Sequence, residues 1–274
     1  MNELAQLLIK ERKYKSRGRI SYSELKIWNE CSFKHMLSYF EEILPFTGNE
    51  YTAFGTAIHS VCEILIVDEH VDAKKFFREY FLKELRTLKS SGYDLNPSMI
   101  REMKLQGENI CQYILPSVKD TFGKYEILSI EEKLMEDIDM FESGGMKFKG
   151  FIDLVLKTED GKIHIIDWKT CSWGWDMKRR TDPIATYQLT LYKYFYAKKY
   201  DMSPEHIETH FALLKRTAKK ENAEIFRVTS GDRKTKNAMS LLERAIKNIN
   251  AENFIKNRLS CSRCQYYKTE HCPG

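Results

Sequence analysis

Two apolar segments that carry charged residues limit how this chain can fold. Phe151–Leu156 and Ile163–Lys169 have the composition of buried strands, yet the first contains Asp153 and the second contains Asp167 and Lys169. Side chains alternate between the two faces of a strand, so Asp167 and Lys169 share a face, about two residue rises apart. A short turn joins the two segments, which favours antiparallel pairing. We therefore expect two carboxylates and a lysine to converge at one edge of a sheet.

These charged groups need chemical partners. Burying a carboxylate or an ammonium group unpaired costs a large amount of free energy, which a divalent cation can offset. Carboxylate oxygens suit Mg²⁺ or Mn²⁺, and a lysine beside the metal can orient a water molecule or stabilise phosphoryl charge. A salt bridge at the strand ends, in which Lys169 neutralises the aspartates, explains the spacing equally well.

The remaining segments predict one α/β domain with a helical insertion. Apolar periodicity predicts helices at 22–44, 57–68, 73–89, 97–122, 183–199 and 234–253, the first with Ser21 or Ser23 as its N-cap. Strands are expected at 125–134, 147–157, 162–169, 206–214 and 224–228. We expect a basic N-terminal segment over 1–20 and a single domain over 21–274, with a helical part at about 56–122, a sheet core at about 125–230 and a cysteine-bearing tail at 259–274.

Two further motifs lie on predicted helices. Gln188 and Tyr192 are four residues apart and so share one helix face, although the same helix also has ordinary core spacing. His59 stands four residues before Glu63, and its imidazole has the chemistry of a metal ligand. A hydrogen-bonded core histidine is the alternative.

Taken together, these residues resemble the PD-(D/E)XK nucleases. Gly150-x-x-Asp153 with Asp167-Trp168-Lys169 matches the bipartite motif of that superfamily. The RecB-like branch adds an early histidine and a Q-x-x-x-Y helix, which match Gly55-Thr56-Ala57-Ile58-His59 and Tyr187-Gln188-Leu189-Thr190-Leu191-Tyr192. These elements occur in the order of that branch, and the resemblance spans from about Ser21 to the C-terminus.

The resemblance implies a restriction-endonuclease-like core, a mixed sheet with flanking helices, and a DNA nuclease that hydrolyses phosphodiester bonds. It implies that Mg²⁺ or Mn²⁺ is held by His59, Asp153, Asp167 and the backbone carbonyl of Trp168. Lys169 would position the attacking water, Gln188 would orient Lys169 or the DNA backbone, and Tyr192 would contact a phosphate. We expect an exonuclease on single strands or duplex ends, because the branch favours it and the sequence shows no sequence-reading domain.

The cysteines indicate a second metal centre. Cys261, Cys264 and Cys272 form a C-x₂-C-x₇-C pattern, and three thiolates need a fourth ligand, for which His271 and Cys31 are candidates. AddAB-type helicase–nucleases and CRISPR adaptation nucleases carry one cysteine before the fold and three after it. The resemblance to them implies that all four cysteines bind a 4Fe–4S cluster. Zinc is the alternative because CxxC spacing serves both metals, and free thiols are a third interpretation.

The motifs are compatible with more than one biological pathway. A CRISPR spacer-processing nuclease and a repair or recombination nuclease that works with a separate helicase share these motifs. The sequence contains no P-loop, so we expect any helicase partner to be another protein. A non-catalytic DNA-binding module is the alternative of another class, and the intact Asp153, Asp167 and Lys169 disfavour it.

The charge pattern permits DNA binding but does not decide it, and we expect a cytoplasmic protein. The net charge is +5, and Lys178, Arg179 and Arg180 follow Trp173 and Trp175 in a cluster that we expect to contact DNA. A solvated helix face with packing tryptophans is the plain alternative. The sequence shows no secretory signal and no apolar run of about 18 residues, so we expect no membrane association. Seven cysteines are too sparse for a disulfide-built fold, which favours reduced or metal-bound thiols.

Overall fold

The computed structural model describes residues 13–43, 48–139 and 145–273, and its contacts form two compact units. The core unit comprises Phe46–Leu134 and Phe151–Thr235, and the terminal unit comprises Met1–Pro45, Met135–Gly150 and Lys236–Gly274. The single domain expected over 21–274 stays a prediction. The first twelve residues of the expected basic segment 1–20, including Lys10 and Arg12, lie outside the described residues.

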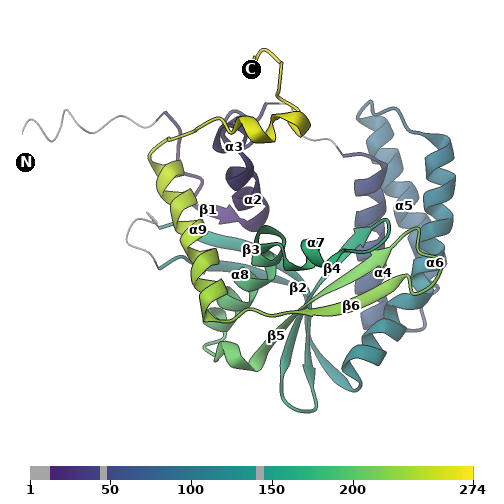
Figure 1. Ribbon diagram of the computed structural model, residues 1–274. Helices are drawn as coiled ribbons and strands as arrows, with labels where there is room; N and C mark the ends of the chain where they lie inside the picture. The colour runs from purple at the N-terminus through teal and green to yellow at the C-terminus, as the bar shows by residue number, and fades with distance from the viewer. Residues whose placement is uncertain (1–12, 44–47, 140–144, 274) are drawn as a thin grey trace, which may run out of the picture. The chain divides into compact units, whose positions relative to one another are not determined.

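A six-stranded mixed sheet organises the fold (Figure 1). Its strands are β1 (Arg19–Ser21), β2 (Tyr125–Asp137), β3 (Lys147–Thr158), β4 (Ile163–Cys171), β5 (Ile207–Lys215) and β6 (Ala223–Val228). The strand order is β1-β3-β4-β5-β6, and β2 also pairs with β3. β4 is antiparallel to β3 and parallel to β5, and β6 is antiparallel to β5. This confirms the predicted α/β class with a mixed sheet core.

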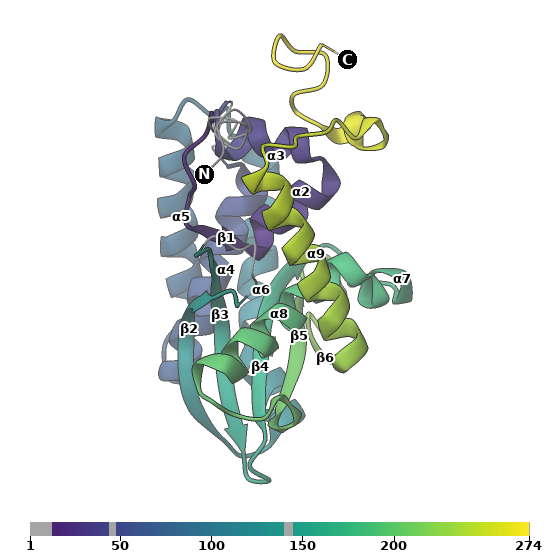
Figure 2. The ribbon, with the colours of Figure 1, turned by 90° about the vertical axis from the view of Figure 1, so that its left-hand side faces the viewer.

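The parallel pair β4–β5 explains the helices between these strands, because parallel neighbours need a crossover connection. The crossover contains α7 (Met177–Thr181), α8 (Pro183–Lys199) and the short 3₁₀ helix η1 (Pro204–His206). Within the core unit α8 packs against β4 and β5 (Figure 2). A layer of three helices covers the opposite face of these strands: α4 (Glu50–Val67), α5 (Ala73–Ser90) and α6 (Pro97–Phe122).

The core of this unit sets the direction of the charged side chains. Ile166 and Trp168 of β4 pack in one buried cluster with Ala57 and Ile58 of α4. Because side chains alternate along a strand, Asp167 leaves β4 on the face that α8 covers. α6 passes so close to α5 that a Cβ on Gly107 would lie 2.0 Å from Phe77 Cζ, so this helix position requires glycine.

The terminal unit joins the two ends of the described chain. It contains β1, α2 (Tyr22–Glu30), α3 (Ser32–Tyr39), most of α9 (Asp232–Asn250) and the 3₁₀ helix η2 (Arg258–Arg263). β1 runs parallel to the start of β3. The amide N–H of Phe33 donates to the carbonyl of Ile255 at 3.2 Å, and Asn257 Nδ2 donates to the carbonyl of Glu30 at 2.8 Å. These bonds hold α2 and α3 beside the segment that precedes η2 (Figure 1).

Two predicted helices differ most from the structure in their limits. The helix expected at 22–44 is interrupted at Cys31, whose φ of −165° is extended backbone, and Leu44 lies outside the described residues. Cys31 ends α2 and its sulfur accepts the N–H of Lys34 at the start of α3. The helix expected at 57–68 begins instead at Glu50, because Asn49 and Thr52 form a capping box seven residues earlier.

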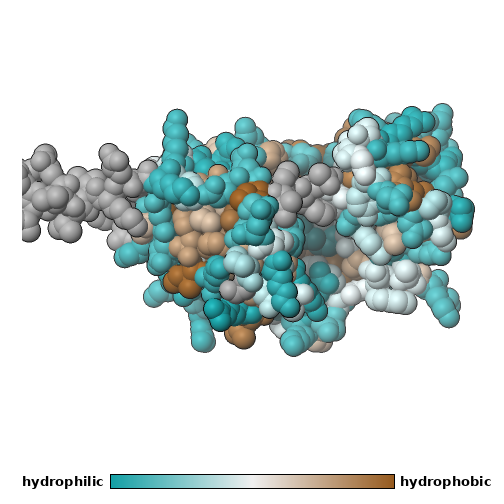
Figure 3. Space-filling view, turned by 90° about the horizontal axis from the view of Figure 1, so that it is seen from above, coloured by the Kyte–Doolittle hydropathy of each residue, from teal (hydrophilic) through white to brown (hydrophobic). Residues whose placement is uncertain are grey.

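None of the helices in the described part of the chain combines the length and the apolarity that crossing a bilayer requires. The face drawn in Figure 3 is mostly hydrophilic, and its hydrophobic residues form separate small patches. Among the described residues, Leu259 and Trp173 are large apolar residues with high exposed fractions, 95% and 76%.

Candidate active site

Asp153 and Asp167 lie side by side where the β3–β4 ladder ends. The recorded pairs run from Lys157↔Ile163 to Leu154↔Ile166, and the two aspartates are the next residues on their strands. Beyond the last pair, the N–H of Trp168 donates to Asp153 Oδ2 at 2.6 Å. The aspartate side chain therefore replaces a backbone acceptor. The meeting point is between two paired strands and not at a sheet edge as predicted, because β4 also pairs with β5 along its whole length.

Two side chains hold the two oxygens of Asp167. Lys169 Nζ lies 2.5 Å from Oδ2, and Gln188 Nε2 donates to Oδ1 at 2.7 Å. Gln188 Nε2 also lies 3.2 Å from Tyr192 Oη, one turn along α8. Asp182 caps α8 and Pro183 occupies its first turn, which fixes where the helix starts relative to β4. The structure thus brings together the four predicted residues Asp167, Lys169, Gln188 and Tyr192.

His59 reaches the same site from α4. Its Nδ1 atom lies 3.8 Å from Asp153 Oδ2, and it hydrogen-bonds with the backbone of Trp168. Burial lowers the pKa of His59, although the charge of Asp167 opposes this effect. A neutral imidazole is the form that binds a metal ion.

The site concentrates negative charge away from water. Burial raises the pKa of Asp153 well above its usual range, and the charge of Asp167 raises it further, while Lys169 opposes the shift. Burial, with a smaller contribution from Asp167, also raises the pKa of Glu131. Sequence reasoning missed Glu131, although two adjacent glutamates in a predicted strand are a detectable signal. Burial raises the pKa of Tyr192 too, so its phenol stays protonated.

The donor set suits a hard divalent cation. Asp167 Oδ2 is buried and receives no hydrogen bond of normal geometry among the described residues, although the Lys169 ammonium contacts it. A cation would compensate this atom and would relieve the repulsion between the two carboxylates. His59, Asp153 and Asp167 do not offer three atoms within 4.8 Å of one another in the described residues, so these side chains would draw closer around an ion.

The side chains of the predicted DNA-binding cluster differ in their exposure and contacts. Lys178 and Arg179 of α7 are exposed, and Arg179 lies over the ring of Trp175 at 4.4 Å. Arg180 Nη2 forms an ion pair with Glu224 at 2.6 Å. Trp175 is buried, whereas Trp173 is exposed. The exposed side chains among these described residues are thus Lys178, Arg179 and Trp173.

The four predicted ligand cysteines line one pocket in the terminal unit. They are Cys31, Cys261, Cys264 and Cys272. Cys31 Sγ accepts the N–H groups of Lys34 at 3.5 Å and Asn257 at 3.4 Å. Cys62 and Cys111 are buried in the core unit. His271, the alternative ligand, does not line this pocket and pairs with Glu270 at 3.4 Å.

Replacing Asp153 by asparagine is expected to stabilise the metal-free protein. The raised pKa means that the folded state binds a proton at Asp153 more tightly than the unfolded state does. The free energy of unfolding therefore falls as pH rises above the usual aspartate pKa. Asparagine keeps an acceptor for Trp168 N but removes the charge. The melting temperature in EDTA should therefore rise by about 2–4 °C for each kcal/mol of repulsion removed, more at pH 8 than at pH 5. Asp120→Asn, on the exposed side of α6, should change nothing. A lower melting temperature for Asp153→Asn in EDTA would contradict the argument.

Comparisons with known proteins identify the family and the fold of this chain. The sequence model of the PD-(D/E)XK nuclease superfamily matches residues 19–269. A solved structure from Eubacterium rectale, provisionally named an exonuclease, is 13% identical over 95% of this chain and 94% of that chain, with a TM-score of 0.58. The crystal structure of SSO0001 is 14% identical over 96% of this chain and 89% of that chain, with a TM-score of 0.43. No curated protein matches. The superfamily match confirms the predicted restriction-endonuclease-like core.

Proposed function

The chain belongs to the PD-(D/E)XK nuclease superfamily, and from this premise we propose that it is a divalent-metal-dependent DNA exonuclease. One observation carries the proposal. Asp153 and Asp167 meet at the end of the β3–β4 ladder, and Asp167 Oδ2 is buried with the Lys169 ammonium against it. Crowded carboxylates of this kind destabilise a metal-free protein, and such groups cluster at functional sites.

Four groups would hold Mg²⁺ or Mn²⁺: the carboxylates of Asp153 and Asp167, the imidazole of His59 and the backbone carbonyl of Trp168. When bound, the ion supplies Lewis acidity toward the scissile phosphate and lowers the pKa of a water molecule. The neutral state of His59 and the crowding of the two carboxylates support this assignment.

The other side chains act on the substrate and on Asp167. Lys169 positions the attacking water and stabilises the negative charge that develops on the phosphate. Gln188 holds Asp167 Oδ1 and so fixes the direction of that carboxylate. The phenolic O–H of Tyr192 donates a hydrogen bond to a phosphate oxygen, because its raised pKa keeps the hydroxyl protonated. Lys178, Arg179 and Arg180 of α7 contribute positive charge toward DNA, with Lys178 and Arg179 the more accessible.

Action on DNA ends is supported by the RecB-like motifs and by the name given to the E. rectale protein, which shares the fold. The test compares linear single-stranded DNA, linear duplex and closed circular DNA with Mn²⁺, each with and without EDTA. We expect linear DNA to disappear, circles to survive and EDTA to stop the reaction. Nicked or linearised circles would overturn the exonuclease assignment and favour an endonuclease such as a spacer-processing enzyme. Binding without cleavage of any substrate would favour a non-catalytic DNA-binding module.

A 4Fe–4S cluster in the terminal unit is the second part of the proposal. Its ligands are Cys31, Cys261, Cys264 and Cys272, which line one pocket. The two N–H groups that point at Cys31 Sγ are the kind of hydrogen bond that tunes cluster sulfurs. Zinc held by the same four thiolates is the alternative, because both metals use cysteine ligands at CxxC spacing.

A separate helicase or a recombination or CRISPR protein is the proposed partner, and the cytoplasm is the proposed location. The sequence carries no P-loop of its own, and a reducing compartment keeps cluster cysteines available. Co-purification of an ATPase with the tagged chain supports a helicase partner, and a chain that purifies alone with full activity on duplex ends argues against one.

A further inference from the structure

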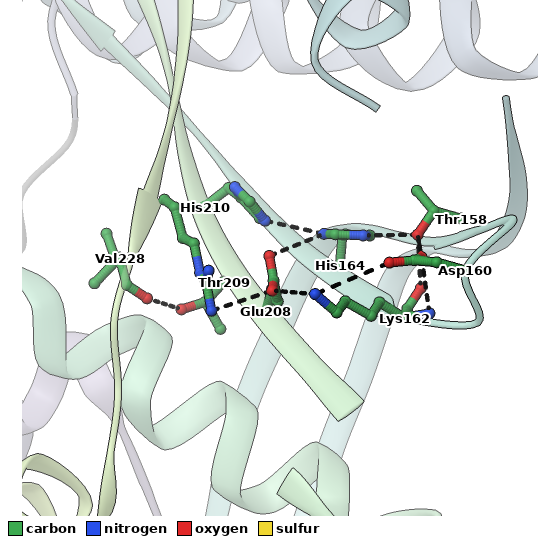
Figure 4. Close-up of polar contacts among 9 residues, drawn as sticks. Thr158, Asp160, Lys162, His164, Glu208, Thr209, His210 and Val228 are labelled. Atoms are coloured by element: carbon green, nitrogen blue, oxygen red, sulfur yellow. Dashed lines mark hydrogen bonds and ion pairs between the residues drawn. The ribbon is translucent and has the colours of Figure 1, made fainter. Parts of the chain in front are cut away.

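Three metal-ligating side chains gather in the core unit outside the active site. His164 lies on β4, and Glu208 and His210 lie on β5 (Figure 4). The parallel register pairs His164 with Glu208 and Ile166 with His210, so the three side chains share one face of the sheet. One ligand atom from each residue lies within 4.8 Å of the other two.

This cluster is separate from the nuclease site. His164 precedes Asp167 by three residues, so the two side chains leave β4 on opposite faces, about 10 Å apart along the strand. The ring of Phe122, at the end of α6, packs 4.9 Å from the ring of His164 and 5.1 Å from that of His210. Gln188, which contacts Asp167, comes from α8 on the other face.

The two imidazoles are buried and directed at each other. His164 and His210 are 7% and 5% exposed. Thr158 Oγ1 lies 3.0 Å from His164 Nε2, which leaves Nδ1 directed toward His210 Nε2 at 3.0 Å (Figure 4). Two nitrogens bonded to one tetrahedral zinc ion at about 2.0–2.1 Å lie about 3.3 Å apart, so a small opening of the pair admits an ion. Burial lowers the pKa of both imidazoles, to about 4 for His210, so both are neutral.

Glu208, the third ligand of the cluster, is held by two basic side chains. Lys162 Nζ and Arg227 Nη2 both contact Glu208 Oε1 at 3.1 Å. The other oxygen, Oε2, lies 4.0 Å from His164 Nδ1. The two cations disfavour ions held by charge alone, such as Mg²⁺ or Ca²⁺. An ion that bonds strongly to imidazole nitrogen tolerates them better.

We propose that His164 Nδ1, His210 Nε2 and Glu208 Oε2 bind a transition-metal dication of the Zn²⁺ type. The ion joins β4 to β5 on the face opposite the nuclease site. Three protein ligands leave a fourth position for water in a four-coordinate site. A hydrogen bond between the two histidines is the competing explanation for their contact.

Zinc stoichiometry separates the two explanations. The full chain is purified anaerobically so that its cysteine centre stays as it is, and excess Mg²⁺ is present to occupy the nuclease site. Wild type should bind one more Zn²⁺ per chain than His164→Asn or His210→Gln. Each of these variants should lose zinc affinity at this site by about 100-fold or more. Thr158→Val, which removes the bond to His164 Nε2 together with the hydroxyl's bonds to Asp160 and to the carbonyl of Lys162, should weaken zinc by about 10-fold. The exposed His206 is the matched control, and His206→Gln should bind zinc as wild type does.

Copper provides a readout that needs no variant. One equivalent of Cu²⁺ bound to the wild-type chain should give an electron paramagnetic resonance signal with hyperfine splitting from two imidazole nitrogens. Copper bound by the four thiolates, or by the two carboxylates and the one imidazole of the nuclease site, would not show two-nitrogen splitting. Equal zinc binding in wild type and both histidine variants, or copper without two-nitrogen splitting, would overturn the proposal. Neither readout depends on nuclease activity, so this inference and the proposed function fail independently.

Discussion

Replacing Lys169 by methionine is expected to lower the rate of DNA hydrolysis about 10³-fold while Mn²⁺ binding persists. The Lys169 ammonium lies 2.5 Å from Asp167 Oδ2 and neutralises that carboxylate until a cation competes for it. Methionine keeps an apolar stem of similar length but removes the charge that stabilises the phosphate and positions the water. Loss of the competing ammonium should leave the Mn²⁺ affinity equal or higher. Initial rates on linear DNA and calorimetric Mn²⁺ titrations measure the two quantities.

Lys157→Met provides the matched control, because Lys157 lies exposed on the neighbouring strand β3. Its rate should equal that of wild type. A Lys169→Met protein that cleaves at the wild-type rate would leave Lys169 with only the salt-bridge role that the sequence also permits. Loss of Mn²⁺ binding together with the rate would show that Lys169 maintains the carboxylates and does not act on the phosphate.

Local periodicity predicted most of the fold because most elements are long. The limits predicted for 97–122 and 183–199 coincide with α6 and α8, where Pro97 and Pro183 mark the first turns. β1 has three residues and α7 has five, which is too short for a hydrophobic period to register. The break at Cys31 was missed because it interrupts an otherwise continuous helical pattern. The side-chain and backbone bonds that stabilise it come from residues more than 220 positions later.

The candidate active site was accessible from sequence because its central residues are local. Asp153, Asp167 and Lys169 lie on two strands joined by a short turn, so alternation and antiparallel pairing place them together. The His164 cluster was not accessible in this way. Its residues come from β4 and β5, which are parallel and separated by the whole α7–α8 crossover, and no local signal fixes the register between such strands.

Replacing Cys31 by serine is expected to remove the iron from the protein and to lower its melting temperature by about 10–20 °C. A cluster that links Cys31 to Cys261 closes a loop of about 230 residues. In the loop-entropy account this restricts the unfolded chain by about 5 kcal/mol, and each kcal/mol corresponds to about 2–4 °C for a chain of this size. Iron analysis, the visible spectrum and thermal unfolding of anaerobically purified protein measure the effect.

Cys171→Ser separates this linkage from a general effect of losing a thiol. Cys171 is a partly exposed cysteine of the core unit, outside the pocket of the four proposed ligands, so its variant should keep iron and melting temperature. If Cys31→Ser keeps its iron and His271→Ala loses it, the fourth ligand is His271 in the C-terminal tail. The cluster would then close only a short loop of the chain. Because a short loop restricts the unfolded chain much less, that result would also predict a far smaller change in melting temperature. A colourless wild-type protein with one zinc ion per chain at these cysteines would show that the site binds zinc and not a cluster. Because zinc would close the same long loop, Cys31 would still be expected to stabilise the fold.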